Sequence, residues 1–157
     1  MNSLNFVRQT LRVQGCSVLW AFAILIPPAF AQDDSELVRS AVRSVGIEVY
    51  LQEMARIGSL KMPYMVDSET QAAAAVAVGR HLQNQWVFVK RAKADLDVSR
   101  LRDLLTGQGL SRVCTNPGTA ILVNEFGATL DHSYSDRNGI FLFGFKANRS
   151  TCGPFAN

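Results

Sequence analysis

The spacing of apolar residues predicts a long amphipathic helix over residues 33–57. Valines and alanines recur there at steps of three and four, which is the period of one helix face. Gly58 and Pro63 supply the expected stop. Gly46 is the weak point of this prediction, because a glycine inside a helix costs about 1 kcal/mol relative to alanine. The helix is therefore expected to bend at Gly46 or to begin late.

After Pro63 the pattern changes from helical towards alternating. Residues 61–66 suit a short edge strand, where proline is tolerated, and residues 67–70 supply a turn. The run 71–78 is ambiguous, because its alanines favour a helix while its end is β-branched. Residues 85–89 predict a strand. If the alanine run pairs with that strand, its small side chains leave space for large neighbours or for a closely packed helix.

Two further helices are predicted in the middle of the chain. Residues 97–105 place apolar side chains on one helix face, with Asp97 as the cap, and Gly107 and Gly109 weaken or end this helix. A short helix is expected to begin at Pro117, because proline is favoured at the first helical position and an asparagine precedes it as a cap.

The last element predicted is a β-hairpin around a turn at residues 136–139, which contains Asn-Gly. The alternating positions are Leu130, His132 and Tyr134 before the turn and Phe141, Phe143 and Phe145 after it. Three phenylalanines on one face need a cover, which the helices are expected to provide. The fold class that follows is α+β, with a mainly antiparallel sheet and a C-terminal hairpin packed against an N-terminal helix and a second helix.

The N-terminal segment predicts export. Arg8 and Arg12 precede an uncharged apolar run over residues 16–26, and Ala29-Phe30-Ala31 has the small-x-small form of a signal-peptide cleavage site. The run is shorter than the roughly 20 residues of a membrane span and is followed by Pro27-Pro28. We expect cleavage between Ala31 and Gln32. Residues 32–157 then form a single α+β domain in the periplasm or outside the cell.

Cleavage changes the charge balance of the chain. The full sequence of 157 residues carries 16 basic and 13 acidic side chains, whereas residues 32–157 carry 14 basic and 13 acidic ones. The nearest approach to a basic cluster is residues 90–93, directly followed by Asp95 and Asp97. Nucleic-acid binding needs a clustered positive surface, so a nucleic-acid partner is not expected.

The number of cysteines predicts a disulfide. Cys16 belongs to the leader, which leaves exactly Cys114 and Cys152 in an exported and oxidising compartment. A redox or metal pair is the alternative, but the chain has no C-x-x-C spacing. We therefore expect a structural Cys114–Cys152 bond that ties the end of the chain to its middle.

Candidate catalytic residues are few. Asp131, His132 and Ser133 are the residue types of a catalytic triad, but neighbours in a strand point to opposite faces and cannot converge. His132 is instead expected to be a partly buried strand histidine, and His81 an exposed one in a turn. Trp86 is interpreted as core packing because it alternates with Phe88 in an apolar strand.

Acidic residues offer a second route to catalysis. Glu48, Glu53, Asp67 and Glu69 are candidates for the paired carboxylates of glycoside hydrolysis, but such a pair needs a cleft and a controlled separation. A solvated surface role is the simpler interpretation. The sequence contains no G-x-S-x-G, H-E-x-x-H, Walker or G-x-G-x-x-G motif, and no cofactor or metal site is predicted.

A family resemblance rests on a spaced pattern of residues. Its motifs are Met62-Pro63 with Val66-Asp67-x-x-Thr70, then Val113-Cys114-Thr-Asn-Pro117, Gly127-x-x-Leu130-x-x-x-Tyr134-x-Asp136-x-x-Gly139 and a final Cys152. The pattern covers about ninety residues and resembles small, exported, uncharacterised bacterial proteins. The resemblance implies a bacterial envelope or secreted protein, and it brings no activity and no site residues.

These observations lead to three functional hypotheses. The first is an exported, non-enzymatic module that binds a protein or a cell-envelope component. The second is a small periplasmic hydrolase acting on envelope polymers, with His132 or an acidic pair in a shallow cleft. The third is a small-molecule carrier, which requires a cavity between the helices and the sheet.

Overall fold

A computed structural model describes residues 28–155 of the chain, with side chains from residue 35 onward. The apolar run of the predicted leader lies outside the described residues, so the leader and its cleavage between Ala31 and Gln32 stay predictions. The first described element is helix α1, Pro28–Val45. Within residues 28–155, no helix is both long and apolar enough to cross a membrane.

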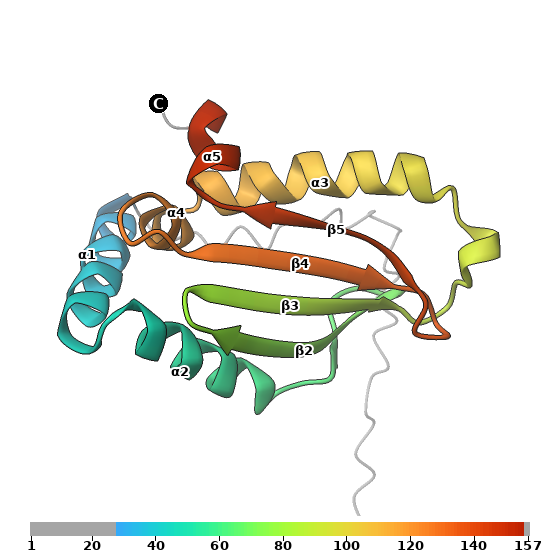
Figure 1. Cartoon of the computed structure of the whole chain (residues 1–157), viewed down its shortest axis with the longest axis horizontal. Coiled ribbons are helices and arrows are strands. Elements are labelled where there is room, and N and C mark those ends of the chain that lie inside the picture. Colours follow the sequence, from blue (N-terminus) through green and yellow to red (C-terminus); the bar gives the residue numbers. More distant parts are fainter. Residues whose placement is uncertain (1–27, 156–157) are drawn as a thin grey trace, which may run out of the picture.

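Five strands form one sheet in the order β1-β2-β3-β4-β5, of which β2 to β5 are labelled in Figure 1. The strands are β1 (Tyr64–Met65), β2 (Thr70–Val78), β3 (His81–Phe88), β4 (Thr129–Ser135) and β5 (Phe141–Ala147). Only β3 and β4 pair in parallel, while the other three pairs are antiparallel. The predicted α+β class with a mainly antiparallel sheet and a C-terminal hairpin is confirmed.

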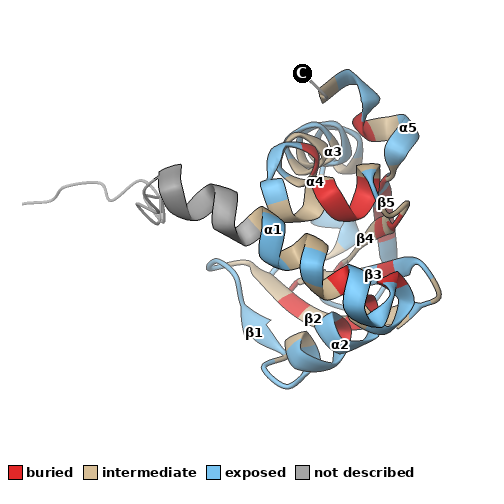
Figure 2. Cartoon of the chain, turned by 90° about the vertical axis from the view of Figure 1, so that its left-hand side faces the viewer, coloured by how far each residue is buried: buried red, intermediate tan, exposed pale blue. Residues whose placement is uncertain are grey.

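The parallel pair is joined by a helical crossover, as parallel strands require. It contains a 3₁₀ turn, Lys93–Asp95, and the helices α3 (Val98–Thr115) and α4 (Pro117–Asn124). The remaining elements are α2 (Ile47–Ser59), α5 (Arg149–Cys152) and a second 3₁₀ turn, Gly153–Phe155. Figure 2 shows buried segments on α1, α2 and α4 where these helices meet one another and the strands.

The helices α2 and α3 pack on the same face of the sheet, which we call the helix face. Ala75 of β2 packs with Leu51 and Ala55 of α2, while Phe88 and Phe143 pack with residues of α3. The cross-strand register places these strand residues in phase with one another. The opposite face, called the open face here, carries no helix among the described residues.

The region predicted as one helix over residues 33–57 is two helices, and the chain breaks at Gly46, where a bend was expected. Gly46 has a φ of +84°, a left-handed conformation that side-chain-bearing residues avoid. Its N–H still donates to Val42 O at 2.8 Å, and its carbonyl accepts from Tyr50 N at 3.0 Å. The glycine therefore turns the chain from α1 into α2 while its own N–H and carbonyl stay hydrogen-bonded to the two helices.

Helix α3 extends beyond its predicted end. It begins as predicted, with the Asp97 side chain accepting from Arg100 N at 3.1 Å, but it runs through Gly107 and Gly109 to Thr115. A Cβ at Gly109 would collide with the ring of Phe145, whereas a Cβ at Gly107 would meet nothing within 4 Å. Gly109 therefore serves close helix–sheet packing and does not end the helix.

The other local predictions agree with the structure, apart from their exact bounds. Asn116 caps α4 by accepting from Thr119 N at 3.1 Å, with Pro117 in the first turn. The expected edge strand is the two-residue β1, and the ambiguous alanine run is strand β2. Gly58 of α2 lies close to Ala75, so the small side chains of β2 do allow a helix to approach closely.

The hairpin turn is organised by a buried carboxylate. Asp136 is fully buried and accepts backbone N–H groups of Lys93 at 2.8 Å, Asn138 at 2.8 Å and Ile140 at 2.9 Å. Desolvation raises the pKa of Asp136, but these three donors, together with the positive charge of Arg137, hold it below its usual value. The carboxylate thus joins the hairpin turn to the segment that precedes α3.

The expectation that three phenylalanines share one face is wrong for Phe141. The β4–β5 register shifts between Tyr134 and Ser135, so that Tyr134 pairs with Phe143 while Ser135 pairs with Phe141. The extra residue turns Phe141 to the open face, where it is 60% exposed, while Phe143 on the helix face is 4% exposed.

The disulfide joins Cys114 of α3 to Cys152 of α5, with a Cα–Cα distance of 5.2 Å. Both cysteines are buried in the larger apolar cluster of the protein. The bond anchors the C-terminal helix to the end of α3, as the cysteine count predicts.

Candidate functional site

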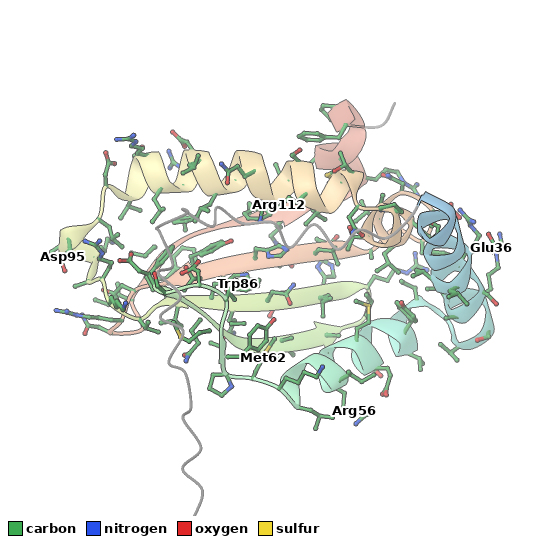
Figure 3. The ribbon with its side chains drawn as sticks, turned by 180° about the vertical axis from the view of Figure 1, so that it is seen from behind. Glu36, Arg56, Met62, Trp86, Asp95 and Arg112 are labelled. Atoms are coloured by element: carbon green, nitrogen blue, oxygen red, sulfur yellow. A yellow bond between two sulfur atoms is a disulfide. The ribbon has the colours of Figure 1, made fainter. Side chains whose placement is uncertain are left out.

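A hollow of about 330 Å³ opens on the helix face between α3 and the strands. We call it the aromatic groove, and it is lined by Val66, Asp67, Thr70, Trp86, Phe88, Leu101, Leu105, Gly109, Arg112, Val113, His132, Tyr134 and Phe145. Its volume is at the lower end of the range for ligand pockets, and its lining is mainly apolar with a few polar groups, as is typical of binding sites. Figure 3 labels two of the residues that line this groove, Arg112 on α3 and Trp86 on the sheet.

The floor of the groove is built from aromatic side chains of three neighbouring strands. His132 of β4 stacks on Phe145 of β5 with ring centroids 4.7 Å apart, and on Trp86 of β3 at 6.1 Å. Tyr134 stacks on Phe88 at 5.8 Å. These stacks follow from the period of two in each strand, which sends alternate residues to the helix face. Because each ring is held by its neighbours, the floor is preorganised.

His132 lies at the centre of this floor as a neutral imidazole. Trp86 Nε1–H donates to His132 Nδ1 at 3.1 Å, so the ring proton of the neutral form lies on Nε2. Burial lowers the pKa of His132 to about 4, while the nearby Asp131 charge opposes this shift. Its Nε2 is buried and has no hydrogen-bond partner among the described residues.

Two charged residues border the aromatic floor. Arg112 of α3 and Asp67 of the β1–β2 turn both line the groove. Asp67 Oδ1 accepts from Glu69 N and Thr70 N, each at 2.7 Å, so this carboxylate shapes the turn. Burial raises the pKa of Tyr134, and the positive charge of Arg112 lowers it in part, which places that charge within electrostatic reach of the phenol.

The Asp131-His132-Ser133 sequence does not form a triad, as the strand geometry predicts. Asp131 lies on the open face, with Oδ2 3.5 Å from His81 Nδ1 and Oδ1 3.4 Å from Lys146 Nζ. Ser133 also lies in phase with Asp131, whereas His132 faces the groove. His81, expected in the turn itself, is the exposed first residue of β3.

The candidate acidic residues do not come together as a pair in the groove. Glu53 pairs with Arg56 on α2, Glu69 pairs with Arg91, and Glu48 is exposed on α2. Asp67 is the only carboxylate that lines the groove among residues 35–155. Within the same range, no group of three or more His, Cys, Asp or Glu side chains is arranged to hold a metal ion.

A second, more polar hollow of about 370 Å³ lies on the open face around Asp131. Gln83, Ser133 and Lys146 line it, together with the exposed ring of Phe141. It shares His132 and Phe145 with the groove, but Trp86, Phe88 and Tyr134 do not line it, and its lining includes no residue of a helix. The groove is therefore the better candidate for a specific binding site.

Sequence reasoning identified part of this site. It treated Trp86 as a core residue and His132 as a partly buried strand histidine, and both lie partly buried in the groove floor. It missed Arg112 and the wall residues Leu101 and Leu105. An isolated arginine in a helix carries no local signal of a binding site. Gly109 did offer a signal, because a glycine inside a helix can mark close packing against another element, but it was interpreted as a helix end.

Comparisons with known proteins inform the fold. A scan against protein-family models finds no match, and a search of curated proteins finds none either. Among solved structures, the chain is similar to a Pseudomonas aeruginosa protein described as secreted, with a TM-score of 0.57 and 21% identity, over 68% of this chain and 92% of that one.

Two pilotins of type 2 secretion systems share the fold as well. EpsS of Vibrio vulnificus matches with a TM-score of 0.55 and 9% identity, over 77% of this chain and 96% of its own. AspS of Vibrio cholerae matches with a TM-score of 0.51 and 12% identity, over 77% of this chain and 97% of its own. At these identities the likeness establishes a common fold, which spans nearly the whole of each of these proteins.

Proposed function

We propose that this protein is an exported binding protein that holds a segment of a protein partner in the aromatic groove. The observation that carries the proposal is the groove itself, which combines a preorganised aromatic floor with a roof from α3. Partly buried tryptophan and tyrosine rings are the side chains that most often dominate binding energy at protein interfaces. An apolar side chain of a partner would bury its surface against Trp86 and Tyr134.

Export and a protein partner are supported by two further observations. The N-terminal sequence has the charged region, apolar run and small-x-small motif of a signal peptide. The fold is shared with a secreted protein and with pilotins, which are components of a bacterial secretion system. A location in the bacterial envelope, next to the protein that it binds, would explain both the N-terminal signal sequence and the shared fold.

Site-specific photo-crosslinking tests the proposal. A photoreactive phenylalanine analogue replaces Leu105, which lines the groove, in the full chain expressed in its source cells. The matched control replaces Leu104, the next residue of α3, which is 53% exposed and lies outside the groove. We expect a crosslink from position 105 to one defined segment of one protein, and a clearly weaker product from position 104.

The comparison of the two positions decides the outcome. Equal products at 104 and 105 would mean non-specific contact with α3, and no product at 105 would mean that no protein occupies the groove. Either result overturns the proposal.

A small-molecule carrier is the second candidate, because the cavity that this hypothesis requires lies between a helix and the sheet. Native mass spectrometry of the protein purified from its own compartment tests this function. A bound molecule of defined mass, lost after Trp86→Ala substitution but retained after Phe141→Ala substitution, would favour the carrier over the protein-binding function.

A further inference from the structure

The groove contains a positive charge without a counterion. Arg112 is the only basic side chain that lines it among residues 35–155, and its guanidinium makes no ion pair or side-chain hydrogen bond with a described residue. Some other arginines of the described residues do pair with acids, as Arg39 with Glu125 and Arg56 with Glu53, whereas Arg112 is exposed and unpaired. The groove therefore offers a guanidinium that is free to bind an anion.

Asp67 does not supply that anion. It is the only acid that lines the groove in the described part of the chain, and its Oδ1 already accepts two backbone N–H groups of its own turn. No ion pair links it to Arg112. The positive charge of Arg112 thus remains available to an occupant of the groove.

A neutral histidine lies in the floor of the same groove. The Trp86 hydrogen bond to His132 Nδ1 places the imidazole proton on Nε2, and this buried N–H finds no acceptor among the described residues. The buried Nε2 is out of reach of an occupant, and the neutral ring adds no second charge to the groove. An ionised carboxylate accepts through two oxygens, so it matches the N–H donors of the Arg112 guanidinium.

The rest of the groove is apolar. Leu101 and Leu105 of α3 face the aromatic floor of Trp86 and Tyr134. We infer that the groove recognises an acidic side chain next to an apolar side chain in the partner's segment, with the carboxylate on Arg112 and the apolar group on the aromatic floor. This inference rests on the proposed function and specifies the chemistry of the partner.

The experiment selects peptides from a random hexapeptide library on the immobilised full chain. Every peptide is acetylated and amidated, so the carboxylates in the library come from Asp and Glu side chains alone. The same selection is run on Arg112→Gln and on Arg100→Gln. Arg100 is the matched control, because it lies on the same helix, is exposed and lines a different surface hollow.

We expect retained peptides to share Asp or Glu beside a large apolar residue. Replacing that acid by its amide should weaken binding to the unmodified chain about tenfold, which is the scale of one charge-assisted pair. The tenfold difference should disappear in Arg112→Gln and persist in Arg100→Gln. Apolar peptides without the acid should bind both variants equally.

Several results would overturn the inference. Retained peptides without acidic enrichment, equal binding of acid and amide peptides, or an equal effect of both arginine substitutions would each exclude carboxylate recognition by Arg112. Retention of no peptide, with binding of decanoate in its place, would make the groove a lipid site. A crosslink at Leu105 with no preference for acids would leave the proposed function intact and remove only this inference.

Discussion

The two ends of the sheet are packed in different ways. At one end, small and aliphatic side chains form a closed cluster with α1, α2 and α4, which includes Leu51, Leu122 and Ala75. At the other end, a smaller cluster of Phe88, Leu142 and Phe143 packs under α3. We refer to them as the aliphatic cluster and the aromatic cluster. The groove lies on the aromatic side.

The difference follows from the size and shape of the side chains. Alanines in β2 let α2 approach the strands closely, and buried aliphatic side chains pack together at this end of the sheet. Large planar rings stack on one another across the strands and do not interdigitate with α3 along its whole length. The aliphatic cluster is thus suited to stability, and the aromatic side leaves apolar surface accessible for binding.

The largest expected effect tests whether the aromatic cluster is a true core. Phe143→Ala should destabilise the protein by about 3–5 kcal/mol, because a buried ring is lost and a cavity remains. Phe141→Ala is the matched control and should change stability by no more than about 0.5 kcal/mol, since that ring is 60% exposed. Denaturant unfolding of both variants measures the difference, and equal losses would contradict the register shift in the hairpin.

The next largest effect on stability concerns the disulfide, whose two cysteines belong to the aliphatic cluster. Cys114→Ser should lower the stability of the oxidised protein by about 3–4 kcal/mol, because the bond closes a loop of 38 positions in the unfolded chain. Thermal unfolding with and without reductant measures it. The reduced wild type and the reduced variant should unfold alike, and equal losses in both redox states would show that packing, not the bond, is responsible.

A smaller effect is the pH dependence of stability that His132 in the groove floor should cause. The folded-state pKa of His132 is about 4, below the ordinary value of 6.5, so protonation favours the unfolded chain. The contribution of His132 to the free energy of unfolding is fully present above pH 6.5. It should fall by about 3 kcal/mol as the pH drops to 4. Unfolding free energies measured from pH 8 to pH 4 test this expectation.

The variant His132→Gln should remove that part of the pH dependence. It leaves Asp136 in place. The pKa of Asp136 is depressed, so its protonation lowers the stability of the fold only at more acidic pH. An unchanged slope between pH 6.5 and 4 in His132→Gln would mean that another group is responsible.

The smallest expected effect concerns the distance between α3 and the sheet. Gly109→Ala should destabilise by about 1–3 kcal/mol, because its Cβ collides with the Phe145 ring and pushes the helix away from the groove floor. Gly107→Ala, in the same helix with open space around it, should stabilise by up to about 1 kcal/mol. Thermal unfolding compares them, and a stabilising Gly109→Ala would show that α3 is not held by this contact.

Much of the fold could be predicted from local chemistry. The caps at Asp97 and Asn116 and the turn at Asp67 act within a few positions of their own chain, as do the hydrogen bonds of Asp136 to its own hairpin turn. The disulfide followed from counting the cysteines that remain after the leader. Such features depend on neighbours in sequence, so the sequence determines them directly.

What the tertiary structure decided depends on neighbours in space. Gly109 could be interpreted as a helix end until Phe145, from a distant strand, was placed against it. A one-residue register shift in the hairpin turned Phe141 to the open face, although its spacing matches that of Phe143. The groove exists because α3, three strands and the β1–β2 turn meet. The sequence by itself determined which side chains are available there. Only the packing of these elements decided that the side chains line one common space around Arg112 and His132.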